Sequence, residues 1–133
     1  MIYILVPTFA RVSQTKKFLD SLNQSIQENH RIILIDDHPE KVTLKNIQQN
    51  NNIKILLSEK ELWWVGSINL GIQNIIKEQD LKDEDIVIFA NNDVEIDKNC
   101  FDLLYNELKK DNAQIVHPRT FDQNGLEVSS GAK

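Results

Sequence analysis

The sequence predicts one α/β domain, residues 1–133, built on a mainly parallel sheet with helices on both faces. Short apolar runs alternate along the chain with stretches in which apolar residues recur at helical spacing, and this βα alternation is typical of parallel sheets. The runs are apolar throughout, as expected for strands that are covered on both sides. A chain of 133 residues suits a single domain that buries roughly 70% of its unfolded surface.

The first half of the chain predicts three strands and two helices. Residues 2–6 form an unbroken apolar run, and apolar residues then recur every three or four positions over 12–26. The second expected strand covers residues 31–35, in which four apolar residues follow Arg31. A weaker helical pattern over 40–49 precedes the third expected strand, 53–57.

The second half continues the alternation. The expected elements are a helix over 67–78, a strand over 86–89, a helix around 101–108 and a short fifth strand over 114–116. Asp97 and Asn99 are both suitable N-cap residues for the last helix. Asn124-Gly125, between apolar residues, predicts a hairpin turn.

The composition excludes several classes of protein. The formal net charge is −5 without a basic stripe, so nucleic acid is not an expected partner. The single Cys100 rules out an internal disulfide or a Cys-based zinc site. Since no signal-peptide pattern and no apolar run of ~20 residues occurs, we expect a cytoplasmic protein without a membrane-spanning segment.

Polar or unusual residues follow three of the expected strands. Residues 7–11 come after the first strand, 36–39 after the second and 91–93 after the fourth. Carboxyl ends of parallel strands share one edge of a sheet, and ligands bind there in open α/β folds. We therefore expect these residues to converge on a crevice.

The side chains at these strand ends suit a nucleotide ligand. Phe9 can stack on a base, Asp37 can accept a base N–H, and Asp93 is an oxygen ligand of the kind that joins Mg²⁺ or Mn²⁺ to phosphates. Each also has a plain structural reading: Phe9 closing the core, and the acids forming turns. Their convergence on one edge favours a site.

Four sequence motifs carry a family resemblance. They are Val6-Pro7-Thr8-Phe9-Ala10-Arg11, Ile35-Asp36-Asp37, Trp63-Trp64-Val65-Gly66-Ser67-Ile68-Asn69-Leu70-Gly71-Ile72 and Phe89-Ala90-Asn91-Asn92-Asp93-Val94. In this order they resemble the N-terminal, donor-binding half of family 2 glycosyltransferases, closest to the rhamnosyltransferase-like branch. The resemblance covers nearly the whole chain and implies the GT-A fold, which is Rossmann-like.

The resemblance also implies roles for individual residues. Those implied to bind the donor nucleotide are Pro7, Thr8, Phe9, Arg11, Asp36 and Asp37. Those implied to border the donor sugar and diphosphate are Trp64, Gly66, Asn69, Asn91 and Asn92. Asp93 is implied to bind a divalent metal, Mg²⁺ or Mn²⁺. We expect the tryptophan pair to lie in a loop, and Asn69 near a helix N-terminus that favours phosphate.

Two residues depart from the family pattern. Ala10 stands where the family often has Asn, and Asn92 stands where many members have a first Asp. Because an amide oxygen is a neutral ligand, the second change predicts lower metal affinity.

The implied reaction is inverting transfer of a sugar from a UDP- or dTDP-sugar to a hydroxyl of a saccharide or lipid-linked acceptor, in surface polysaccharide synthesis. A carboxylate serves as general base in such transfers, and here it is implied to lie beyond Lys133. The chain ends after the predicted hairpin without a terminal helix, so we interpret it as truncated. An unfinished sheet edge also predicts self-association into a homo-oligomer.

Two other functions remain open from the sequence. One is a non-catalytic nucleotide-binding module, or a relic that lacks the acceptor half. The other is a receiver-like signalling domain, suggested by Asp36-Asp37 after an apolar run, although receivers carry their acidic pair after the first strand.

Overall fold

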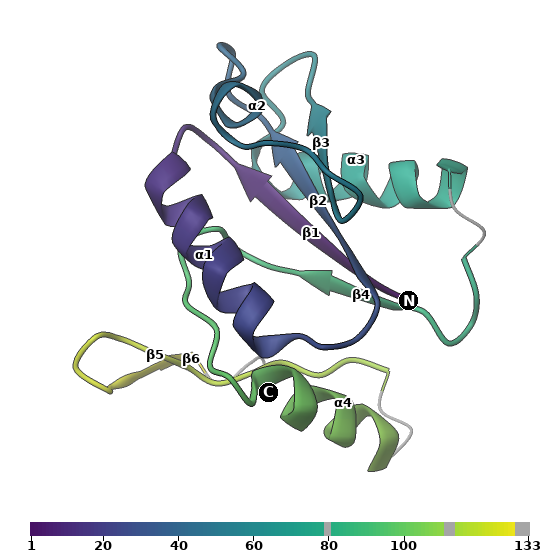
Figure 1. The fold of residues 1–133 in the computed structure, drawn as a ribbon, viewed down its shortest axis with the longest axis vertical. Coiled ribbons are helices and arrows are strands. Elements are labelled where there is room, and N and C mark those ends of the chain that lie inside the picture. Colours follow the sequence, from purple (N-terminus) through teal and green to yellow (C-terminus); the bar gives the residue numbers. More distant parts are fainter. Residues whose placement is uncertain (79–80, 111–113, 130–133) are drawn as a thin grey trace.

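The structure is a computed structural model that describes residues 1–78, 81–110 and 114–129. Its sheet contains four strands, β1 (Ile2–Thr8), β2 (His30–Asp36), β3 (Ile53–Leu57) and β4 (Ile86–Phe89). All pairings are parallel and the strand order is β3-β2-β1-β4 (Figure 1). The first four predicted strands and the parallel sheet are therefore confirmed.

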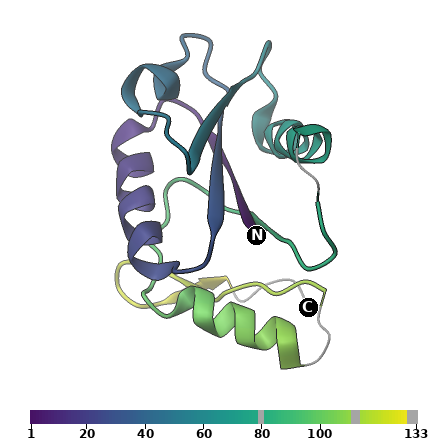
Figure 2. The same ribbon diagram turned by 45° about the vertical axis from the view of Figure 1, so that its right-hand side comes forward.

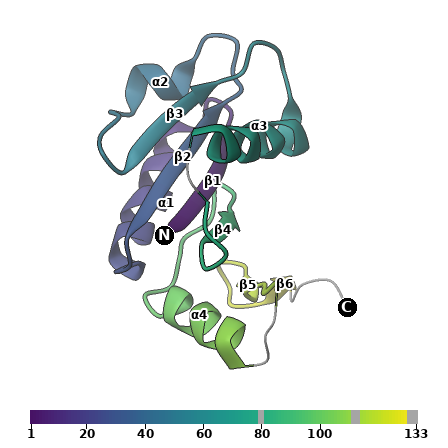
Figure 3. The same cartoon turned by 90° about the vertical axis from the view of Figure 1, so that its right-hand side faces the viewer.

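Helices cover both faces of the sheet, as predicted. α1 (Val12–Ser25) lies on one face and α3 (Trp63–Glu78) on the other, with the strands between them (Figures 2 and 3). Within the described residues, no helix is long and apolar enough to cross a membrane.

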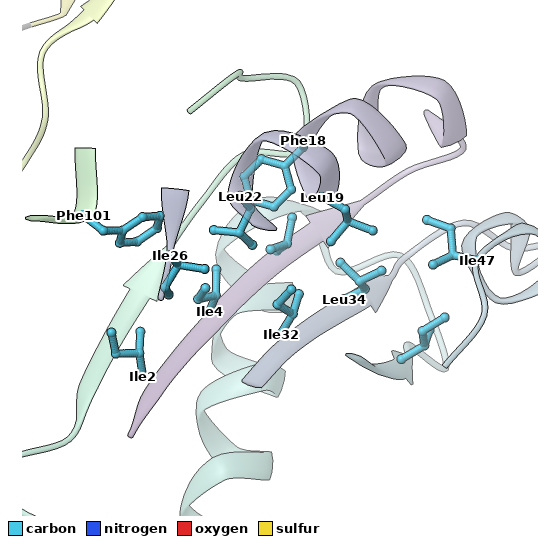
Figure 4. Packing of buried hydrophobic residues seen from close by; sticks show 12 residues of the cluster. Ile2, Ile4, Phe18, Leu19, Leu22, Ile26, Ile32, Leu34, Ile47 and Phe101 are labelled. Atoms are coloured by element: carbon cyan, nitrogen blue, oxygen red, sulfur yellow. The ribbon is translucent and has the colours of Figure 1, made fainter. Parts of the chain in front are cut away.

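The two central strands, β1 and β2, are mostly apolar because both of their faces are buried. Ile4 lies in the cluster on the α1 side, together with Phe18 and Leu22 (Figure 4). The next residue, Leu5, points the other way, into the cluster beneath α3 that includes Ile68. Neither Ile4 nor Leu5 has exposed surface. Alternation along each strand thus fills two cores at once.

Gly71 lets α3 approach the sheet closely. A Cβ atom on this residue would lie 3.0 Å from Leu5 Cδ1 and 3.4 Å from Ile35 Cδ1. A side chain here would push the helix away from β1, so the glycine sets the distance between the two layers.

The helix expected over 40–49 is shorter, and α2 covers only Val42–Asn46. Lys41 before it has a left-handed φ of 52°, and Ile47 after it is extended and buried. The extended backbone at Ile47 ends the helix and allows this side chain to pack in the core.

The last predicted helix is confirmed as α4 (Cys100–Lys110). Of the two N-cap candidates, Asn99 directly precedes the helix, and the carboxylate of Asp97 accepts its N–H at 2.9 Å. The hydroxyl of Ser25 donates to the carbonyl of Asp97 at 2.8 Å. This bond ties the entry of α4 to the end of α1.

The strand predicted over 114–116 is wrong. Residues 114–119 form no helix or strand, and Ile115 is 89% exposed, so the apolar pair there gains no burial from pairing. The chain instead forms an antiparallel hairpin of β5 (Thr120–Phe121) and β6 (Glu127–Ser129). Its turn contains Gly125 at φ 79°, which confirms the hairpin predicted from Asn124-Gly125.

Candidate functional site

The loops after β1, β2 and β4 meet the start of α3 at one edge of the sheet. They comprise residues 7–11, 36–38, 91–93 and 62–64, which we call the rim. The backbone joins the first two loops, because the N–H of Asp37 donates to the carbonyl of Thr8 at 3.0 Å. The convergence predicted for the strand ends is present.

Side-chain contacts link the rim segments in pairs. The rings of Phe9 and His38 lie edge to face, with centroids 4.8 Å apart. Across the rim, the Nε1–H of Trp64 donates to the Oδ1 of Asn91 at 2.9 Å. The first contact joins the β1 and β2 loops, and the second joins α3 to the β4 loop.

An ion pair closes this ring of contacts. Arg11 Nη1 lies 2.7 Å from Asp93 Oδ2, joining the β1 loop to the β4 loop. Both side chains are partly exposed, at 58% and 41%. Phe9, Asp37 and Asp93 thus lie on one connected edge of the molecule.

Asp37 fixes the start of α3 from a distance. Its buried carboxylate accepts the N–H of Leu62 at 2.9 and 3.0 Å and that of Trp63 at 2.9 Å. These are the free N–H groups that open a helix. A side chain from the β2 loop therefore acts as the cap, and Trp63 takes a left-handed φ of 58°.

This remote cap overturns two expectations about α3. The helix begins at Trp63 instead of near Ser67, so the tryptophan pair belongs to its first turn and not to a loop. Gly66 and Asn69 lie further inside the helix, and Asn69 is exposed on its surface. The predicted proximity of Asn69 to a phosphate-binding helix N-terminus is wrong, since the opening amides donate to Asp37.

Two residues predicted to bind nucleotide are buried supports of the rim. Asp36 has no exposed surface, and its carboxylate accepts the N–H of Leu44 at 3.0 Å and of His38 at 3.3 Å. Thr8 is also buried, and its hydroxyl bonds that of Thr43 at 2.7 Å. Together they fasten α2 to the carboxyl ends of β1 and β2.

Three aromatic side chains of the rim face solvent. The exposed fractions are 47% for Phe9, 74% for Trp63 and 47% for Trp64. Exposed aromatic faces offer stacking surfaces to flat rings and to the C–H faces of sugars. Pro7 beside them is half-buried.

Comparison with known proteins identifies the family. The model of glycosyl transferase family 2 matches residues 3–130, almost the whole chain. The chain belongs to glycosyl transferase family 2. This confirms the family expected from the four motifs.

A solved structure shows the same fold. It is the crystal structure of S. aureus TarS 1-349, with a TM-score of 0.58 and 15% sequence identity. The alignment covers 92% of this chain and 40% of the TarS chain. The similarity confirms the expected GT-A fold. This chain spans less than half of the length of the TarS chain. No curated protein matches the chain significantly.

The structure explains the departure of Asn92 from the family's Asp. Asn92 is buried, and its Nδ2 donates to Thr15 Oγ1 at 2.9 Å. The Thr15 hydroxyl donates its own hydrogen bond to the carbonyl of Arg11 at 2.8 Å, so it can only accept from Asn92. The position therefore needs a donor, which an amide has and a carboxylate lacks. Asn92 anchors the β4 loop on α1, while Asn91 and Asp93 stay exposed.

The rim presents one exposed carboxylate, that of Asp93, while Asp36 and Asp37 are buried. Among residues 1–78, 81–110 and 114–129, no group of three His, Cys, Asp or Glu side chains is arranged to hold a metal ion. Glu95 lines a groove with Lys17 and Asp20 of α1. A single carboxylate is compatible with Mg²⁺, which commonly uses one or two carboxylates when substrate phosphates supply further oxygens.

Ala10 stores strain at the turn that directs Arg11 across the rim. Its φ is 56°, a left-handed conformation that costs an alanine roughly 1–2 kcal/mol and that Asn tolerates better. This gives a physical reason for the Asn that the family often carries there.

We predict that Ala10→Asn raises the free energy of unfolding by about 0.5–1 kcal/mol. Urea denaturation followed by circular dichroism measures the change. Ala10→Val is the opposing control, because a β-branched residue fits this conformation worst. A stabilising valine would contradict the explanation.

Proposed function

We propose that the rim binds the nucleotide-diphosphate sugar donor, a UDP- or dTDP-sugar, of an inverting glycosyl transfer. The observation that carries this proposal is the closed ring of contacts. It brings a stacking ring, a guanidinium and an exposed carboxylate together at the carboxyl ends of the strands. Family membership supports the reaction class.

The residues divide the donor between them. Phe9 stacks on the base, and Trp64 borders the sugar from the first turn of α3. Asp93 holds the divalent metal, Mg²⁺ or Mn²⁺, which when bound neutralises charge on the diphosphate leaving group. Asp37 retains acceptor capacity for a base N–H, because a carboxylate offers about four lone-pair sites and its backbone donors are Leu62 and Trp63.

The acceptor is a hydroxyl of a saccharide or lipid-linked saccharide in this proposal. Its proton must pass to a general base as the bond to the anomeric carbon forms. Arg11 engages the exposed carboxylate of Asp93 in the rim. We therefore place donor binding on the rim and assign no rim residue as the base.

Titration calorimetry with UDP and dTDP, with and without Mn²⁺, tests the proposal. We expect at least one nucleotide to bind in the presence of Mn²⁺ and to bind more weakly without it. If neither nucleotide binds with Mn²⁺ present, the donor site is wrong. Sugar transfer to an added acceptor distinguishes an enzyme from a binding module.

Phe9→Ala should weaken nucleotide binding about three- to tenfold in this titration. Stacking of a base on an aromatic ring contributes roughly 1–3 kcal/mol. The neighbouring ring of His38 remains in the variant and should retain part of this stacking energy. Phe121→Ala is the matched control, since Phe121 is similarly exposed at 54% but lies on the hairpin. Equal losses in both variants would remove the stacking role.

A further inference from the structure

The carboxylate proposed to hold the metal already has a cationic partner. Arg11 Nη1 contacts Asp93 Oδ2 at 2.7 Å, and both groups face solvent. A divalent ion on the same carboxylate would lie within a few ångströms of the guanidinium. Even two like unit charges 4 Å apart repel by roughly 1 kcal/mol in water and about 4 kcal/mol near a protein surface, and the metal carries two charges. Metal binding and this ion pair therefore compete.

The backbone of Arg11 is held while its side chain is exposed. Its carbonyl accepts both the N–H and the hydroxyl of Thr15, at 2.9 and 2.8 Å. These bonds fix the residue at the entry of α1. The guanidinium can leave Asp93 through side-chain rotation alone, without unfolding the rim.

Charge balance favours an exchange of partners. In the free chain, Arg11 and Asp93 neutralise each other. A sugar-nucleotide diphosphate brings about two negative charges, one for each phosphate, and a divalent metal brings two positive ones. Asp93, the metal and the diphosphate together carry about one negative charge. The site is therefore neutral only if Arg11 stays beside the diphosphate.

We propose that Arg11 is an exchangeable counter-ion of the donor site. It occupies Asp93 in the free chain, gives up that carboxylate to the metal, and moves to the diphosphate oxygens when the donor binds. The inference rests on the proposed function, because it assigns Asp93 to the metal and the rim to a sugar nucleotide.

Arg11→Gln tests the exchange through two binding measurements of opposite sign. Mn²⁺ alone, followed by electron paramagnetic resonance of the free ion, should bind about threefold more tightly to the variant than to the unmodified chain. UDP at saturating Mn²⁺, followed by calorimetry, should bind about threefold more weakly. These factors match an exposed ion pair of up to about 1 kcal/mol.

Arg119→Gln is the matched control. Arg119 pairs with Glu127 at 3.6 Å on the hairpin, away from the rim, so its loss should change neither measurement. The tighter Mn²⁺ binding of Arg11→Gln should also shrink in 0.5 M salt, about 4 Å of Debye length, because exposed pairs are screened. Thermal unfolding confirms that both variants are folded.

The outcomes separate the inference from the proposed function. Unchanged or weaker Mn²⁺ binding by Arg11→Gln overturns the exchange, as does unchanged UDP binding. If neither protein binds Mn²⁺, the exchange is also overturned, because no metal then competes with Arg11 for Asp93. If the unmodified chain binds no nucleotide in the presence of Mn²⁺, the proposed function has failed, whatever Arg11→Gln does to Mn²⁺ alone.

Discussion

Replacement of Asp37 by alanine should lower the free energy of unfolding by about 3 kcal/mol. The buried carboxylate accepts the opening N–H groups of α3 from Leu62 and Trp63. Hydrogen bonds to a charged group contribute roughly 1.5–3 kcal/mol each, and donors left unsatisfied add a desolvation cost. Urea denaturation of the unmodified and variant chains measures the difference.

Asp37→Asn keeps one acceptor oxygen in the same place and should lose about half as much. Asp83→Ala, in the exposed loop before β4, should change the stability by less than about 0.5 kcal/mol. Should Asp37→Ala prove no worse than Asp83→Ala, the remote cap does not hold the start of the helix.

Asp93→Ala should weaken Mn²⁺-dependent binding of UDP or dTDP by at least about tenfold. Loss even of groups that only orient metal ligands commonly costs 10–100-fold in metal affinity, and the proposal makes Asp93 a direct ligand. Nucleotide binding without metal should fall far less, because the stacking surface of Phe9 is intact. Calorimetry with and without Mn²⁺ resolves the two effects.

Glu95→Gln provides the comparison for this variant. Glu95 is an exposed acid two residues further along the same loop, and it lines the groove beside α1. Removal of its charge should leave nucleotide binding unchanged. Metal-dependent binding that survives Asp93→Ala, or that falls equally in Glu95→Gln, would overturn the assignment of the metal to Asp93.

The strands and their convergence could be predicted because burial on both faces leaves a strong local signal. Residues 2–6 and 32–35 have no charged position, and such runs have few alternatives to a central parallel strand. The short run over 114–116 shows the limit of that signal. Ile115 and Val116 are apolar, but neither belongs to a paired strand in the described part of the chain.

The arrangement of the rim could not be predicted because its contacts join residues far apart in the sequence. Asp37 caps a helix 25 residues later, so no local pattern marks Trp63 as the start of α3. The need for a donor at Asn92 depends on Thr15, 77 residues earlier. The motifs predicted which segments meet, and only the structure shows how they bond.

Both tryptophans of the chain lie at the entrance to α3, and one of them donates its indole hydrogen to Asn91. All intrinsic indole emission therefore originates beside the proposed sugar subsite. A ligand that covers Trp63 or Trp64, or that draws Asn91 away, would change the intensity or wavelength of that fluorescence without background from elsewhere. The chain thus carries its own optical reporter of what occupies the rim.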